Sequence, residues 1–161
     1  MERIITKDKI GELKCAIVDV AATQAITNAA LCFGNLIWSA PKGIITINSI
    51  HSNVTIVSSG TQTADPEMGF GTVVGDDSAN ATIEAADATM EDWVDGVSIG
   101  ALTSTTAKEY GDTVWEMESP NTMDGSTTAK KVHLNFAGTF TAAQTLTITG
   151  TVKIYYTVIA D

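Results

Sequence analysis

The sequence has few charged residues and especially few positive ones. Only 17% of its 161 residues are charged, and 9 Lys and Arg against 19 Asp and Glu leave a net charge of −10. Every charged residue from Asp65 to Asp95 is acidic, and no Lys or Arg lies between Lys42 and Lys108. Such a surface repels phosphate backbones, so nucleic acid is not expected as a partner. The acidic middle predicts a solvated surface and leaves open a contact with a basic partner.

Cysteine and histidine are scarce, which removes most catalytic and metal chemistry. Cys15 and Cys32 form no C-x-x-C, so neither a zinc knuckle nor a redox motif is present. Their apolar neighbours predict two buried free thiols. His51 and His133 lie far apart, and there is no G-x-S-x-G motif. A nucleophilic triad or a transition-metal site is therefore not expected.

Motifs for nucleotides and calcium are missing as well. The spacing of Gly69, Gly71 and Gly75 does not fit G-x-G-x-x-G, and no Walker lysine follows. No D-x-[DN]-x-[DN]-G loop occurs, although the acidic turns at Asp76 and Asp124 leave calcium open as a minor alternative. We therefore expect no cofactor and no enzyme activity. A carboxylate pair for glycoside hydrolysis stays open only because acids are numerous.

Long apolar runs are absent. No stretch approaches the ~20 apolar residues of a membrane-spanning helix. Residues 25–40 are fairly apolar, but polar residues interrupt them and they begin too late for a signal peptide. The sequence thus predicts a protein that is made in a cytoplasm, stays soluble and has no membrane partner.

The sequence is rich in alternating patterns, and its last stretch shows the clearest one. In Thr145–Ile159, apolar side chains occupy one face, while threonines and Lys153 occupy most of the other. This period of two is typical of a strand with one buried face. Because the stretch is long for one strand, Gly150 is expected to mark a bulge or a bend.

Shorter apolar stretches recur along the chain between turn signals, and they predict about nine strands. These strands are expected within residues 13–20, 44–50, 54–57, 68–75, 81–86, 97–101, 114–118, 132–136 and 145–159, and residues 31–38 form a further apolar stretch. Interruptions are expected at residues 34–35, 51–53, 76–78 and 104–112. Residues 21–30 are expected to form a loop or a short helix, and Asp87–Val94 a short helix capped by Asp87. The strand at 132–136 is expected to form an antiparallel hairpin with the last strand.

These elements predict the fold class. The strands do not alternate with ten-residue helices, so a parallel sheet is not expected. The predicted fold is all-β, an antiparallel β-sandwich of jelly-roll type with one short helix. One domain is expected over residues 1–161, with residues 1–12 as a candidate extended arm.

Three stretches together resemble a known family. They are APKGIITINSI at 40–50, PEMGFGTVVG at 66–75 followed by NATIEAADATMEDWVDG at 80–96, and KKVHLNFAGTFTAAQTLTITGTVKIYYTVI at 130–159. Their order is similar to small structural proteins of tailed bacteriophages, of the capsid decoration or cement type. The resemblance spans roughly residues 40 to 159.

This resemblance implies a virion protein that binds the outer surface of an assembled icosahedral capsid, usually as a homotrimer. Its partner would be the major capsid protein, and it would be made in the host cytoplasm. The resemblance implies no catalytic residues. We expect partner contacts from the arm and from the acidic region, at Arg3, Ile4, Ile5, Lys7, Lys9, Glu91, Asp92 and Trp93.

Two other classes remain open. A tail or fibre component, or a carbohydrate-binding module, would use the same fold and exposed aromatic side chains. The candidate aromatic residues are Trp38, Trp93, Tyr110, Trp115 and Tyr155. A hydrolase is the least favoured class, and it predicts two carboxylates about 5 to 10 Å apart in a cleft.

Overall fold

The computed structural model describes residues 11–27, 29–60, 66–100, 108–115, 122–141 and 143–160, with residues 84–85 and 108–115 described by their backbone alone. The strands are β1 Leu13–Ile26, β2 Ala30–Ser39, β3 Ile44–Ser58, β4 Glu67–Gly71, β5 Asp76–Ser78, β6 Val94–Ser98, β7 Lys108–Trp115, β8 Thr122–Asp124, β9 Lys131–Thr139 and β10 Gln144–Ala160. The helical turns are α1 Ile83–Ala86 and the 3-10 turn η1 Ala88–Met90.

The strands pair as one long hairpin that is rolled up. From the two ends of the chain towards its middle, β1 pairs with β10, β2 with β9, β3 with β7 and β4 with β6, all antiparallel. The hairpin then closes on itself because β10 also pairs with β3, and β9 with β4. This order is that of a jelly roll. The predicted all-β sandwich is confirmed.

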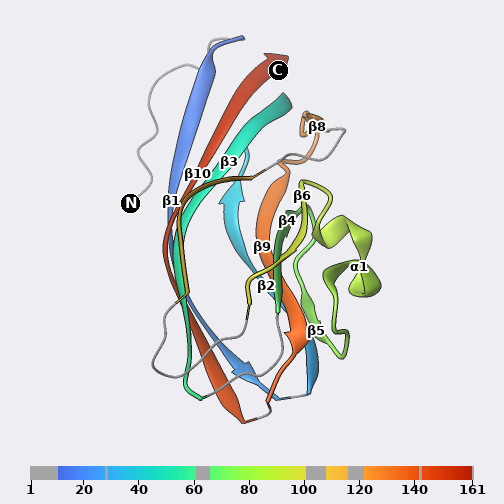
Figure 1. Cartoon of the computed structure of the whole chain (residues 1–161). Helices are drawn as coiled ribbons and strands as arrows, with labels where there is room; N and C mark the ends of the chain where they lie inside the picture. The colour runs from blue at the N-terminus through green and yellow to red at the C-terminus, as the bar shows by residue number, and fades with distance from the viewer. Residues whose placement is uncertain are drawn as a thin grey trace.

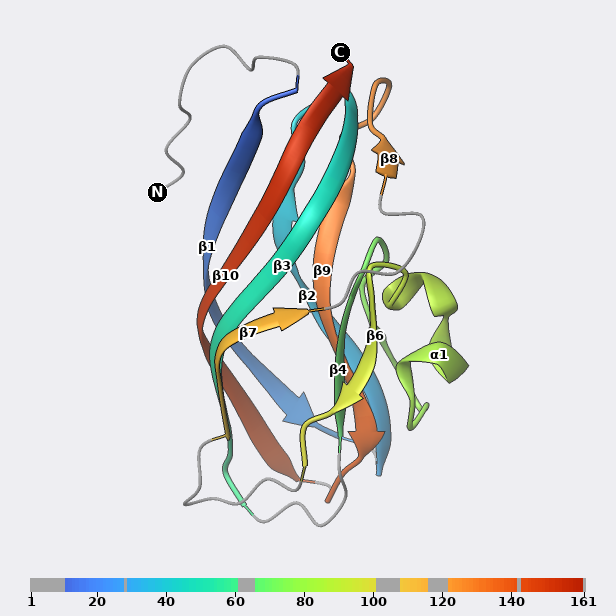
Figure 2. The ribbon, with the colours of Figure 1, turned by 45° about the horizontal axis from the view of Figure 1, so that its top comes forward.

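Two sheets result, and they face each other across one core (Figure 1). The long sheet has the order β1-β10-β3-β7, with β8 beside β3, and the short sheet has the order β5-β2-β9-β4-β6. Figure 2 shows that β1, β10 and β3 run almost the full height of the molecule and curve along it. The α1 turn lies on the outer side of the short sheet, away from the long sheet.

The alternating pattern of the last stretch does build the core. On β10, Leu146, Ile148, Val152, Ile154 and Val158 are all at most 1% exposed. Their burial is the main source of stability for such a strand, because each large apolar side chain contributes roughly 1.5–3 kcal/mol when removed from water. The prediction of a strand with one buried face is confirmed.

The predicted bulge at Gly150 is wrong, because its pairing with both neighbours continues without a shift. Its φ of +142° is a value that L side chains rarely adopt. A Cβ at this position would lie 2.1 Å from the carbonyl oxygen of Asn53. Glycine is therefore needed for close approach of β3. Register shifts lie instead at Asn48 of β3, between the pairs Tyr155–Ser49 and Tyr156–Ile47, and at Ile159 of β10, between the pairs Val158–Ile45 and Ala160–Ile44.

Several strand boundaries also differ from those expected. Residues 21–26 continue β1, and β2 and β3 run through the expected interruptions at 34–35 and 51–53. Long pairing partners explain this, because a strand that has neighbours to bond with tolerates glycine and polar residues. The expected hairpin of the last two long strands is wrong, since β9 pairs with β2 and β4 in the other sheet.

The acidic middle of the chain differs most from expectation. The expected strand at 81–86 contains the helical turn α1, as its alanines favour. The expected helix from Asp87 to Val94 is only the short turn η1, although Asp87 caps it by accepting a hydrogen bond from the Thr89 amide. The expected turn at 76–78 is β5, and the expected loop at 104–112 overlaps β7.

Candidate interface surfaces

Three adjacent strands of the long sheet, β1, β10 and β3, carry few charged residues. The only charged side chains on β1, β3 and β10 are Lys14, Asp19 and Lys153, which sum to +1 in a chain of net charge −10. On β10 the outward positions carry mainly threonine, as the alternating sequence predicts. The outer face of these three strands can approach another acidic protein without strong repulsion.

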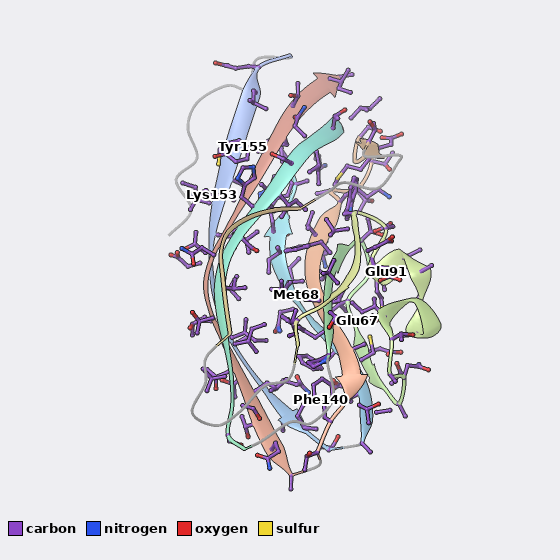
Figure 3. The ribbon with its side chains drawn as sticks, viewed as in Figure 1. Glu67, Met68, Glu91, Phe140, Lys153 and Tyr155 are labelled. Atoms are coloured by element: carbon purple, nitrogen blue, oxygen red, sulfur yellow. The ribbon has the colours of Figure 1, made fainter. Side chains whose placement is uncertain are left out.

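An apolar patch lies where β1 begins. Leu13 is 61% exposed and Ile17 is 67% exposed, and the exposed Cys15 stands between them. On the neighbouring β10, Tyr155 lies opposite Cys15 and Lys153 lies opposite Ile17. Figure 3 shows Tyr155 and Lys153 on the long sheet close to β1. We call Leu13, Cys15 and Ile17 the β1 patch.

The same strand is an edge of its sheet. In the described part of the chain, β1 pairs with β10 alone, over fourteen residues without a register shift. The outermost strands of the short sheet are much shorter, three residues in β5 and five in β6. Long edge strands present unpaired backbone groups and are where other chains add. The β1 edge is therefore a candidate interface.

A shallow hollow lies beside the patch on the same face. It is lined by His51, Ser52, Asn53, Thr151 and Lys153. The ring of His51 also contacts that of Tyr155, with centroids 4.9 Å apart. No carboxylate lines this hollow, so it does not provide the pair of acids that a glycosidase needs.

The outer face of the short sheet is closed by the chain itself. Residues 72–93, here called the cover, lie over β9, whose inner seven residues are all buried. The side chain of Asn135 on β9 is fully buried. It donates to the carbonyl oxygens of Val73 (2.9 Å) and Met90 (2.6 Å), and it accepts from the Gly75 amide (2.9 Å). One side chain thus holds both ends of the cover.

The residues at the end of the cover bind their own chain. The carboxylate of Glu91 accepts from the Gly96 amide at 2.7 Å, and Glu91 is only 9% exposed. Asp92 accepts from both the amide and the hydroxyl of Thr72, each at 2.7 Å. Trp93 is 3% exposed. The expectation that Trp93 faces a partner is corrected, because the apolar indole is part of the core.

Glu91 has a carboxylate neighbour in Glu67 of β4. Figure 3 shows both near α1, and Glu67 accepts a hydrogen bond from the Ile83 amide. Both carboxylates therefore satisfy backbone amides, Glu67 that of Ile83 in the cover and Glu91 that of Gly96 in β6. Their positions are explained by structure and do not require a reaction.

The two cysteines differ in environment. Cys32 is buried as predicted, and burial, together with the negative charge of Asp76, raises the pKa of its thiol to about 12. Cys15 is exposed, which contradicts the prediction of two buried thiols. Its side chain points outward because odd-numbered residues of β1 face solvent.

The acidic turns considered for calcium bind their own hydroxyl residues. Asp76 accepts from the Ser78 amide at 3.1 Å, and Asp124 accepts from the Ser126 hydroxyl at 2.6 Å and its amide at 3.0 Å. Hydrogen bonds from the hydroxyl and the amide of Ser78 lower the pKa of Asp76, and those from the hydroxyl and the amide of Ser126 lower the pKa of Asp124. Within the described residues, no group of three or more His, Cys, Asp or Glu side chains could hold a metal ion.

The other expected contact residues have mixed outcomes. The arm residues Arg3, Ile4, Ile5, Lys7 and Lys9 lie outside the described residues, as do the side chains of Tyr110 and Trp115. Trp38 and Trp93 are buried, and Tyr155 is half-buried. Sequence reasoning missed the β1 patch, because residues 13–20 are apolar on both faces apart from Lys14 and Asp19. Across the described chain, no helix has the length and apolarity needed to span a membrane.

The fold and the surfaces together define a double-sheet jelly roll, in which the described residues cover the outer face of one sheet and leave that of the other open. No protein-family model and no curated protein matches the sequence. Among solved structures, the chain is similar to one in a cyanophage Pam1 capsid asymmetric unit, with a TM-score of 0.50 and 14% identity over 97% of this chain and 93% of that one. At this identity the likeness shows a shared fold.

Chains from infectious bursal disease virus are more distant. The Gx strain structure gives a TM-score of 0.32 at 11% identity over 98% of this chain and 40% of that one. The Gt strain structure gives 0.28 at 10% identity over 96% and 43%. At these TM-scores the two chains do not inform the fold.

Proposed function

We propose that this protein is a structural component of a phage virion that binds the outer surface of the capsid and stabilises it. The observation that carries the proposal is the jelly roll matched over nearly its whole length by a chain of a cyanophage capsid asymmetric unit. The sequence resemblance to capsid decoration proteins supports the same function. The major capsid protein is the proposed partner, and a homotrimer the proposed assembly.

The described surface is consistent with a binding function rather than a catalytic one. Its hollow lacks paired carboxylates, and the two neighbouring acids Glu67 and Glu91 hold backbone amides. A carbohydrate-binding module has less support, because two of its candidate aromatic residues, Trp38 and Trp93, are buried. We therefore propose that the protein is not an enzyme and works by holding other proteins.

The acidic cover supplies a surface for the shell. Asp76, Asp77, Asp87 and Asp95 are exposed on or next to it, with no Lys or Arg in that part of the sequence. Such a surface complements basic loops of a capsid protein. A protein that binds only the mature shell stabilises that shell by mass action.

Co-sedimentation tests the proposal. Purified protein is mixed with capsids of the phage that encodes it, before and after shell expansion, and centrifuged. We expect saturable binding to expanded shells and a higher melting temperature of the decorated shell. Protein that remains in the supernatant with both shell forms would refute the proposal.

A further inference from the structure

The β1 edge has little of the usual protection of an exposed strand, apart from the charge of Lys14 on its inward face. Natural edges are shortened, bulged, covered, or interrupted by proline and inward charges. β1 is fourteen residues long, contains no proline and keeps an unbroken register with β10. Within the described residues, no second strand lies on its other side. An edge with this regular register is suited to pairing with another strand.

The side chains and charges at this edge indicate what that strand is. The exposed side chains of Leu13 and Ile17 would lose contact with water if an apolar strand lay beside them. Two copies of a chain of net charge −10 repel each other wherever acids gather, but β1, β3 and β10 together carry +1. The part of the long sheet next to the β1 edge is thus a region where a second copy can approach.

We propose that the β1 strands of two copies pair antiparallel about a two-fold axis at Cys15, which joins their long sheets edge to edge. Paired residues must face the same side, so odd-numbered residues lie opposite odd-numbered ones. Centring on Cys15 places Leu13 of each copy opposite Ile17 of the other, so the two β1 strands pair over residues 13–17. It sets neither Lys14 against Lys14 nor Asp19 against Asp19, and like charges directly opposite would be destabilising.

This contact is small by the standard of stable dimers, which bury about 1,600 Å² in total. It is therefore weak in solution and becomes effective where copies are held close together. A capsid surface provides that condition, because bound neighbours have a high effective concentration. In this setting the proposal rests on the proposed function, and the β1 pairs link neighbouring copies across two-fold positions of the shell.

Cross-linking of the full chain with a short bismaleimide tests the pairing in solution. Cys15 is exposed and Cys32 is buried, so the native protein has one reactive thiol among its two cysteines. Opposed residues in antiparallel strands have Cα atoms about 4.5–5.5 Å apart, within reach of the reagent. We expect a Cys15–Cys15 dimer whose yield rises with concentration, and sedimentation should show the same dimer.

Two lysine variants separate edge pairing from chance collisions. Ile17→Lys replaces the apolar Leu13–Ile17 contact, which occurs twice in the two-fold dimer. We therefore expect the dimer dissociation constant to rise about tenfold. Val97→Lys is the matched control, because Val97 is 48% exposed but lies on β6 of the other sheet. An unchanged dissociation constant in Ile17→Lys, or an equal rise in both variants, overturns the proposal. So does a monomer without cross-linking up to about 1 mM.

The same reagent on decorated shells identifies the occupant. A product with the mass of two copies supports the proposal, whereas a product of one copy with the capsid protein assigns the edge to a strand of the shell. Protein that binds shells without forming Cys15 dimers there or in solution overturns the pairing and leaves the proposed function intact. Protein that dimerises through Cys15 but never binds shells refutes the proposed function alone.

Discussion

The outer faces of the two sheets differ in what covers them. Over the short sheet, the cover contributes Ile83 and Met90 to a second buried cluster with Cys32 and Ala137. Over the long sheet, the described chain places no such layer, and Leu13 is 61% exposed. The difference shows that a strand's sequence depends on both of its faces: β9 is buried on both, whereas β10 alternates.

A change in the centre of the long sheet should have the largest effect on stability. Gly150→Ala forces a side chain into an unfavourable φ and against the Asn53 carbonyl, so we expect a loss of about 4 kcal/mol from strain and overpacking. Urea unfolding measures it. Gly60→Ala is the control, because its new Cβ meets only the movable Gln144 side chain. Equal losses in both variants would contradict the role of Gly150.

A change under the cover should be the next largest. Asn135→Ala removes the three hydrogen bonds that a fully buried side chain makes to the backbone of the cover, so we expect a loss of about 3 kcal/mol. It should also speed the reaction of Cys32 with a maleimide, because the cover no longer closes over that thiol. Thr149→Ala on the open face of β10 should change stability by less than about 0.5 kcal/mol. Similar values for the two variants would contradict the difference between the faces.

Charge reversal compares the two faces as binding surfaces. Asp95→Lys and Asp19→Lys make the same charge change, beside the cover and on the long sheet, and both residues are exposed. If the cover meets basic capsid loops, Asp95→Lys should weaken shell binding about tenfold, and Asp19→Lys should change it little. Binding isotherms on expanded shells, at fixed salt, measure both. A stronger effect of Asp19→Lys would assign the shell contact to the long sheet.

The smallest predicted effect is that of pH on the free energy of unfolding, through His133 of β9. Burial lowers the pKa of His133, and the nearby positive charge of Lys131 adds to this, while Asp92 opposes it. A histidine with a lowered folded pKa contributes full stability above its unfolded pKa of about 6.5, and this contribution falls as pH drops below that value. We expect a loss of at most about 1.4 kcal/mol at pH 5.5. His133→Gln should reduce this loss, and an identical pH profile would contradict the assignment.

Much of the fold could be predicted from the sequence, because a strand with one buried and one exposed face alternates apolar and polar residues. The alternation in β10 identified its buried face because its other side meets solvent. The cover could not be predicted, because its path depends on contacts with Asn135 and on glycines that allow close approach. Gly71, for example, would place a Cβ 2.2 Å from the Met90 carbonyl carbon. Pairing between distant strands, such as β9 with β2, leaves no local signal either.

The candidate surfaces were less predictable than the fold. Glu91 and Trp93 belong to an acidic stretch that suggested exposure, yet hydrogen bonding and apolar burial turn both inward. Leu13 and Ile17 were expected in a strand that is apolar on both faces, and the sequence did not show which face stays open. Only the position of β1 at a sheet edge reveals the β1 patch.

Electron cryomicroscopy of the intact virion tests the account most directly. The account predicts density for this jelly roll on the outside of the capsid shell, with the cover toward the shell and β1 edges of neighbouring copies meeting at two-fold positions. Density for the protein in the tail, or a virion whose capsid lacks it, would contradict a function in capsid stabilisation.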